Sequence, residues 1–186
     1  TLSCSSAASD VYKRQDSADA VMLSAETAAG EYPIESVDMM NRIILEAEGD
    51  EAYQASTTSK QNVVEPTVSD AITLAARQVA ETVNANCIVT YTTSGSTTLR
   101  AARERPTVPI LCVTSSLLTA RRMAIAWGIH SVHIDQEERF STVVKRAVDI
   151  AETQGFASSG DHIVITAGVP MGKSGSTNVL RIERIP

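Results

Sequence analysis

The residues most suited to chemistry form a loop at 92–97, between an apolar run at 87–91 and a helical pattern at 97–105. The loop comprises Thr92, Thr93, Ser94, Gly95, Ser96 and Thr97. A glycine lets the backbone approach a ligand, hydroxyl groups donate hydrogen bonds, and the amide groups at a helix N-terminus attract negative charge. We therefore predict a phosphate-binding loop. Serine and threonine also cap helices in most proteins, so this loop alone leaves a purely structural role open.

A second loop rich in glycine and hydroxyl groups, at 168–177, contains Lys173, Ser174, Gly175 and Ser176. Its start nearly matches the P-loop of nucleotide hydrolases, but three residues, not four, separate Gly168 from the Gly-Lys-Ser at 172–174. The loop also precedes a predicted strand, whereas a P-loop cradles phosphate with the helix that follows it. We exclude nucleotide hydrolysis here and predict an anion-contacting loop with Lys173 as its positive charge.

No pattern indicates a metal site or a catalytic triad. His130 and His133 are three residues apart in a predicted strand, so their side chains point to opposite faces of the sheet. Trp127, the only tryptophan, is most simply explained as packing in the core. No Ser–His–Asp or Cys–His arrangement follows from the spacing. We expect no metal ion to be bound by this chain.

Composition narrows the class of protein. The 186 residues are 43% hydrophobic and 20% charged, which is typical of a globular chain that can bury a core. The net charge of −6 argues against a nucleic-acid partner, and no apolar run approaches the ~18 residues of a membrane span. The three cysteines, Cys4, Cys87 and Cys112, show no paired spacing. That pattern suits a reducing compartment, so we predict a cytoplasmic protein.

Strands and helices alternate in the larger part of the chain. Strands are expected at 87–91, 110–114, 129–134, 162–166 and 178–184, and helices from about 67, then near 97–105, 117–127 and 140–153. This order predicts an α/β fold, with a parallel sheet covered by helices on both faces. The last connection is too short for a crossover, so the fifth strand is expected to be antiparallel. If the first and fourth strands are neighbours, the two loops enclose one crevice.

The chain divides into four segments by pattern. Residues 1–15 carry no periodic pattern and are expected to be a non-native or disordered lead. Residues 16–48 form one β/α unit, with a strand at 19–23 and a helix from Pro33 whose apolar stripe is Val37, Met40, Ile44 and Ala47. A single such unit has no partner strand, so we expect it to belong to a larger domain. Residues 49–66 are a polar linker, and 67–186 form the α/β domain.

From residue 16 to 186 the chain resembles pyruvate kinases. The longest match is the run Asp19-Ala-Val-Met-Leu-Ser-Ala-Glu-Thr-Ala-Ala-Gly-Glu-Tyr-Pro33, which resembles the last segment of that family's catalytic barrel. Ala25 stands where the family usually has glycine. Shorter matches to the family's C-terminal regulatory domain follow in the same order: Ser69–Ile72, Thr93–Gly95, Arg105-Pro106, Pro109-Ile110, Ala120–Arg122, Trp127-Gly128 and Thr177-Asn178.

The resemblance implies a fold and an activity. It implies a three-layer αβα sandwich with a five-stranded mixed sheet of order 3-2-1-4-5 and strand 5 antiparallel, preceded by a remnant of a TIM barrel. The family transfers a phosphoryl group from phosphoenolpyruvate to ADP in glycolysis, uses Mg²⁺ and K⁺, and forms homotetramers. Its catalytic lysine and its metal and potassium ligands match no residues here, so the chain alone is expected to be inactive. Ser24 matches a position at the barrel mouth and is the one candidate for a catalytic role.

The resemblance also makes the two loops the site of a phosphorylated effector. Family members selective for a sugar bisphosphate have a tryptophan and an arginine at positions that align with Gln136 and Val143. Without that arginine we expect a sugar monophosphate or AMP to bind better than fructose 1,6-bisphosphate, although Lys145 or Arg146 could substitute. A stand-alone sugar-phosphate or nucleotide-binding module is the alternative function, and the segment at 19–33 argues against it.

Overall fold

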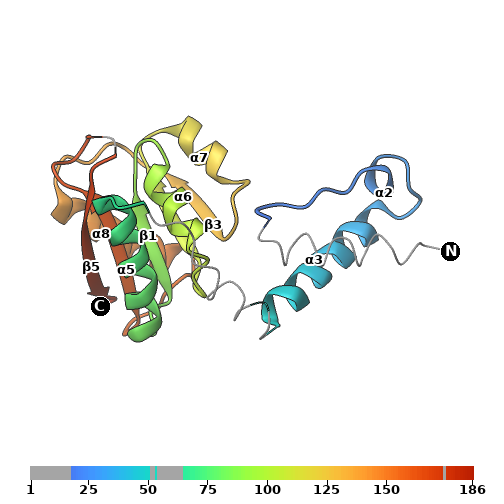
Figure 1. The fold of residues 1–186 in the computed structure, drawn as a ribbon, viewed down its shortest axis with the longest axis horizontal. Coiled ribbons are helices and arrows are strands. Elements are labelled where there is room, and N and C mark those ends of the chain that lie inside the picture. The colour runs from blue at the N-terminus through green and yellow to red at the C-terminus, as the bar shows by residue number, and fades with distance from the viewer. Residues whose placement is uncertain (1–17, 51–52, 54–64, 174) are drawn as a thin grey trace. The chain divides into compact units, whose positions relative to one another are not determined.

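The structure is a computed structural model that describes residues 18–50, 53, 65–173 and 175–186 (Figure 1). Its contacts divide the chain into two compact units, residues 1–61 and 62–186. The predicted lead at 1–15 and most of the predicted linker at 49–66 lie outside the described residues. The two units are therefore considered separately.

The described part of the N-terminal unit includes the helices α2 (Ala25–Ala28) and α3 (Pro33–Gly49). Pro33 occupies the first turn of α3, as predicted, because its fixed φ suits that position and its missing N–H is not needed there. Within the expected stripe, Met40 and Ala47 are buried but Val37 is 51% exposed. The predicted strand at 19–23 is wrong, since those residues form no strand. A strand needs a hydrogen-bonded neighbour, and the described part of this unit supplies none.

The C-terminal unit is built on one sheet of five strands in the order β3-β2-β1-β4-β5. The strands are β1 (Cys87–Tyr91), β2 (Ile110–Thr114), β3 (Ile129–His133), β4 (His162–Gly168) and β5 (Thr177–Arg184). β3, β2, β1 and β4 are parallel, and β5 pairs antiparallel with β4. The predicted order 3-2-1-4-5 and the antiparallel fifth strand are confirmed.

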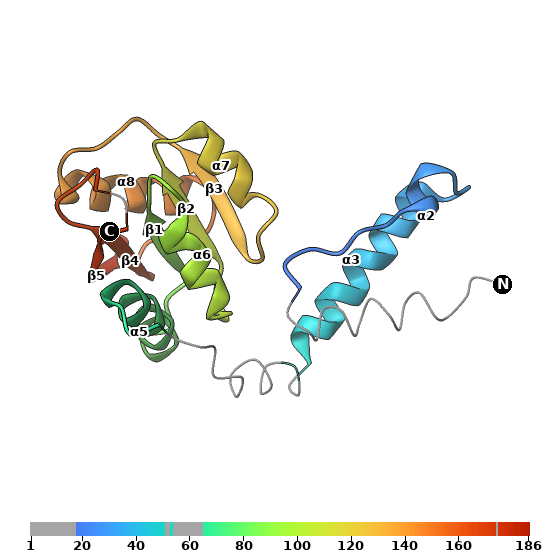
Figure 2. The ribbon, with the colours of Figure 1, turned by 45° about the horizontal axis from the view of Figure 1, so that its top comes forward.

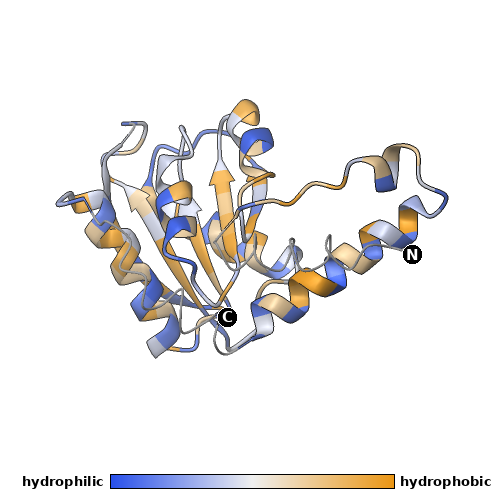
Figure 3. Ribbon diagram, turned by 45° about the vertical axis from the view of Figure 1, so that its right-hand side comes forward, coloured by the Kyte–Doolittle hydropathy of each residue, from blue (hydrophilic) through white to orange (hydrophobic). Residues whose placement is uncertain are grey.

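Helices cover both faces of this sheet (Figure 2). They are α5 (Val68–Thr82), α6 (Ser96–Arg103), α7 (Leu117–Met123) and α8 (Phe140–Thr153). Strand side chains alternate, so Val89 packs in the cluster that includes α8 whereas Ile88 packs against Ala76 and Ala80 of α5. The αβα sandwich is thus three layers deep. Hydrophobic residues line the strands between the helical layers (Figure 3).

The predicted helix at 117–127 is shorter than expected, because α7 ends at Met123. The chain must turn there to enter β3, and Gly128 takes a φ of 67° in that turn. Trp127 is only half-buried, so the expectation of a core anchor is wrong. Its ring instead lies 4.8 Å from the guanidinium carbon of Arg105, which places a cation over the aromatic face.

Candidate functional site

Two loops meet at the carboxyl ends of β1 and β4, which are adjacent parallel strands with Thr90 opposite Thr166. The hollow between the loops has a small cavity volume of about 20 Å³. It is lined by Tyr91, Thr92, Thr93, Ser94, Thr97, Gly168, Met171, Gly172, Lys173, Gly175, Ser176 and Thr177. This hollow, the loop pocket, lies where a doubly wound sheet binds ligands.

The wall after β1 turns sharply into α6 at Gly95. Gly95 has a φ of 86° and is the N-cap of α6, so the capping residue itself has no side chain to accept from the first amide groups of that helix. The Ser96 amide lies 3.5 Å from Ser94 Oγ, which accepts from it. The Gly95 amide donates to Thr92 Oγ1 at 3.0 Å, which fixes the turn. Ser94 Oγ lies 3.2 Å from Ser96 Oγ. The wall therefore offers hydroxyl groups and the positive end of a helix.

The wall between β4 and β5 is held at its two ends. The side-chain amide of Asn178 donates to Val169 O at 2.7 Å, and its carbonyl oxygen accepts from Val169 N at 2.8 Å. Ser176 Oγ donates to Lys173 O at 2.7 Å, inside the loop. Lys173 is the one lysine or arginine among the lining residues that the structure describes. A strand follows this loop, so the exclusion of a nucleotide-hydrolysing P-loop stands.

Buried hydroxyl groups tie the two walls to each other and to their neighbours. Thr97 Oγ1 of α6 and Thr177 Oγ1 of β5 share a hydrogen bond across the base of the pocket. Thr119 Oγ1 of α7 donates to Thr93 O at 2.8 Å. Because these bonds join residues from four different segments, the pocket has a preset spacing between its walls.

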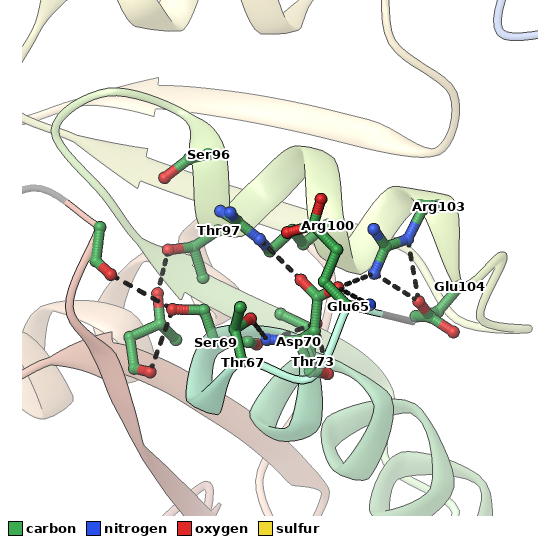
Figure 4. A network of polar contacts seen from close by, with 12 residues as sticks. Glu65, Thr67, Ser69, Asp70, Thr73, Ser96, Thr97, Arg100, Arg103 and Glu104 are labelled. Carbon is green, nitrogen blue, oxygen red and sulfur yellow. Dashed lines mark hydrogen bonds and ion pairs between the residues drawn. The ribbon is translucent and has the colours of Figure 1, made fainter. Parts of the chain in front are cut away.

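Beside the pocket, Asp70 of α5 is a carboxylate with no exposed surface (Figure 4). Its Oδ1 accepts from Arg100 Nε at 2.7 Å, and its Oδ2 accepts from Arg103 Nη2 at 2.9 Å and from Glu65 N at 2.8 Å. Burial alone would raise the pKa of Asp70, but the hydrogen bonds from Arg103, Glu65 N and Arg100 outweigh burial and lower it. Buried Glu104 accepts a second bond from Arg103. We call these five residues the Asp70 network.

The structure brings most of the predicted phosphate-binding residues together. Thr92, Thr93, Ser94, Thr97, Lys173, Gly175 and Ser176 line the loop pocket. Gly95 and Ser96 lie in the same loop but not in the lining, and Ser174 lies outside the described residues. Ser24 is exposed in the N-terminal unit, where its backbone amide donates to Glu26 Oε2 at 3.0 Å.

Sequence reasoning missed several residues around the pocket. The lining also contains Tyr91, Met171 and Thr177, and Ser69 reaches the pocket loop from α5. The sequence carries one signal for this region: Thr67-Val-Ser-Asp70 resembles a capping box, which predicts a helix N-terminus there. Thr67 does cap α5, because its hydroxyl accepts from Asp70 N, but the Asp70 carboxylate binds arginines of another helix.

Among residues 18–50, 53, 65–173 and 175–186, no three histidine, cysteine, aspartate or glutamate side chains gather to hold a metal ion. His130 contacts Gln154 and the ring of Phe156. No helix in the part of the chain that the structure describes is long and apolar enough to cross a membrane.

Comparisons with known proteins agree on one family. The family model described as "Pyruvate kinase, alpha/beta domain" matches residues 70–183. A pyruvate kinase of Methylorubrum extorquens is 42% identical over 90% of this chain, and one of Geobacillus stearothermophilus is 38% identical over 91%. A solved pyruvate kinase from Cryptosporidium parvum aligns with a TM-score of 0.82 and 28% identity, over 99% of this chain and 36% of its own.

These relatives are longer proteins, since the chain spans 35% of the Methylorubrum enzyme and 29% of the Geobacillus enzyme. The matched family model covers the sheet, its helices and both loops of the pocket. The chain belongs to the pyruvate kinase family.

Proposed function

We propose that this chain is part of a pyruvate kinase that transfers a phosphoryl group from phosphoenolpyruvate to ADP. Family membership over 70–183 supports the proposal. The whole enzyme would use Mg²⁺ and K⁺, act in glycolysis in the cytoplasm and assemble as a homotetramer. The described residues offer no metal-binding cluster, so no step that depends on Mg²⁺ is assigned to them.

Within that enzyme, residues 16–48 would belong to the last β/α unit of the catalytic barrel, 49–66 would be a linker, and 67–186 would form the regulatory domain. The separation of the chain into two compact units supports this division. A chain restricted to 67–186 should therefore unfold at the same temperature as the C-terminal unit of the full chain. A drop of more than a few degrees would show that the domain needs the preceding segment.

The regulatory domain would bind a phosphorylated small molecule in the loop pocket. One observation carries this proposal: the hydroxyl-rich loop after β1 and the loop with Lys173 face each other across one hollow. A phosphate there would accept hydrogen bonds from Ser94, from Thr97 and from amide groups at the start of α6. Lys173 would supply the positive charge.

The pocket favours one phosphate over two. A second phosphate needs a further cation, and Val143, which aligns with the family arginine, is 1% exposed in the core. Gln136, which aligns with the family tryptophan, is exposed and neutral. Arg146 is in an ion pair with Glu137 at 3.3 Å, and neither it nor Lys145 lines the pocket. We therefore expect a hexose monophosphate or AMP to bind better than fructose 1,6-bisphosphate.

Titration calorimetry on the full chain tests both claims, with glucose 6-phosphate, AMP and fructose 1,6-bisphosphate as ligands. Ser94→Ala should weaken binding of the preferred ligand about tenfold, the value of one hydrogen bond to a charged group. Ser115→Ala is the matched control, because Ser115 follows β2 and lies outside the pocket lining. Tighter binding of the bisphosphate, or equal effects of the two variants, would contradict the proposal.

We also infer that this chain alone has no kinase activity. Phosphoryl transfer depends on positioned metal ions and on charge stabilisation of the transferred group. Ser24 would stand near that chemistry in the whole enzyme, but alone it supplies neither. A coupled assay with phosphoenolpyruvate, ADP, Mg²⁺ and K⁺ should match a blank without protein. Turnover proportional to the amount of purified chain would overturn this inference.

A further inference from the structure

Two adjacent residues in the first turn of α5, Ser69 and Asp70, form hydrogen bonds to two segments that border the loop pocket, although neither residue lines it (Figure 4). Ser69 is buried, at 7% exposure. Its hydroxyl lies 3.3 Å from the carbonyl oxygen of Gly175 in the β4–β5 loop and 3.4 Å from that of Thr177, the first residue of β5. The Ser69 hydroxyl proton is thus shared between two carbonyl oxygens, from residues that follow Ser69 by 106 and 108 positions in the sequence.

Asp70 reaches the opposite wall through α6. Arg100 and Arg103, which it binds, lie on the helix whose first residues, Ser96 and Thr97, continue the loop after β1. Both carboxylate oxygens of Asp70 are occupied, so α6 is tied to α5 at two points. Since α5 also holds the β4–β5 loop through Ser69, this helical turn adds to the Thr97–Thr177 bond in fixing the spacing between the two walls.

We propose that Ser69 is a positioning residue that sets the affinity of the loop pocket for a phosphate group. This inference rests on the proposed effector site. When a binding loop is already ordered, a ligand loses less free energy to ordering it, so affinity rises without any new contact. Asp70 holds the other wall fixed, and the Ser69 hydroxyl holds the β4–β5 loop against it. Loss of that hydroxyl would leave every proposed ligand-contacting group in place but less ordered.

The ligand-bound test uses Ser69→Ala in the full chain, titrated with glucose 6-phosphate. Thr73→Val is the matched control. Thr73 lies one turn further along α5, is also buried, and donates its hydroxyl only within the helix, to Ser69 O and Asp70 O. Ser69→Ala should weaken binding about fivefold, whereas Thr73→Val should leave the dissociation constant unchanged. Equal dissociation constants for wild type and Ser69→Ala would overturn the proposal while leaving the effector site intact.

A ligand-free test separates this proposal from the proposed function. Hydrogen exchange of the amides at 175–177 should become faster in Ser69→Ala and stay the same in Thr73→Val, although both variants lose one buried hydroxyl. If the wild-type chain binds no phosphorylated probe, the effector site is wrong, and so is the role of Ser69 in its affinity. In that case faster exchange would still establish that Ser69 orders the loop. Unchanged exchange would refute the positioning role regardless of binding.

Discussion

Replacing Asp70 by asparagine should destabilise the C-terminal unit substantially. Asparagine has almost the same size, but it has no charge to compensate the two guanidinium groups, and one side-chain oxygen must replace two acceptors. Removal of one partner from a fully buried ion pair costs about 3–5 kcal/mol. Arg100 and Arg103 are 30% and 33% exposed, so water relieves part of that cost. We therefore expect a loss of about 3 kcal/mol, a large share of the 5–15 kcal/mol typical of a domain.

Urea unfolding, followed by circular dichroism, measures this loss. Glu81→Gln is the matched control, because Glu81 lies on the same helix and pairs with Arg77 at 2.9 Å, but its side chain is 37% exposed. An exposed pair at this spacing contributes about 0.3–0.5 kcal/mol. If Asp70→Asn costs no more than Glu81→Gln, the Asp70 network does not hold α5 and α6 together.

The difference between wild type and Asp70→Asn should depend on pH. The pKa of Asp70 in the folded chain lies below its ordinary value of 3.8. A lowered pKa stabilises the folded state fully above that ordinary value, and the contribution is lost as the pH falls through the folded pKa. The variant has no such group, so the gap between the two unfolding free energies should be constant near pH 7 and shrink below about pH 4. A gap that is the same at pH 7 and pH 3 would refute the electrostatic explanation.

Two further predictions concern the interior. Gly95→Ala should destabilise the fold more than Gly155→Ala: both have positive φ, but a Cβ at Gly95 would lie 2.9 Å from Met123 Cε, whereas one at Gly155 meets nothing within 4 Å. Melting temperatures check this, and equal losses would contradict the packing argument. Burial raises the pKa of Cys87 to about 12 and also raises that of Cys112, so few thiolates form. Iodoacetamide at pH 8 should therefore label both only in denaturant, and rapid labelling of the native chain would show that the strands open.

The sheet could be predicted from sequence because its strands are signalled locally. Cys87–Tyr91 and Ile110–Thr114 are fully buried runs bounded by polar turns, and the structure gives them the predicted bounds. Helix α8 also has its predicted bounds, since its apolar face repeats over four turns. The run at 19–23 has the same local signal but no neighbouring strand. A short apolar run in the sequence therefore forms a strand only where neighbouring strands are present to pair with it.

The walls of the loop pocket were predictable for the same reason. Hydroxyl groups and Gly95 follow directly after a buried strand, and their role depends on few distant residues. Ser69 and Asp70 could not be predicted, because their partners lie 106 and 30 residues away. The sequence indicated a capping box at 67–70, which consists of two hydrogen bonds. The bond from Asp70 N to Thr67 Oγ1 is present in the structure. The sequence pattern of a capping box is the same whether or not the carboxylate at its last position binds arginines from another helix. The pattern therefore could not reveal the ion pairs of Asp70.

In the proposed effector site, the distribution of positive charge favours recognition by hydroxyl and amide groups. Arg100 and Arg103 of α6 bind the Asp70 carboxylate, so their charge is largely neutralised within the protein. The chain as a whole carries a net charge of −6, which opposes the approach of any phosphate. Fixed dipoles at the start of α6 act only at short range, so they stabilise an anion once it is seated without attracting anions in general. Because Arg100 and Arg103 are paired with Asp70, the proposed recognition of a phosphate would rest on neutral donors and on Lys173, which is consistent with the proposal of a small, singly phosphorylated ligand.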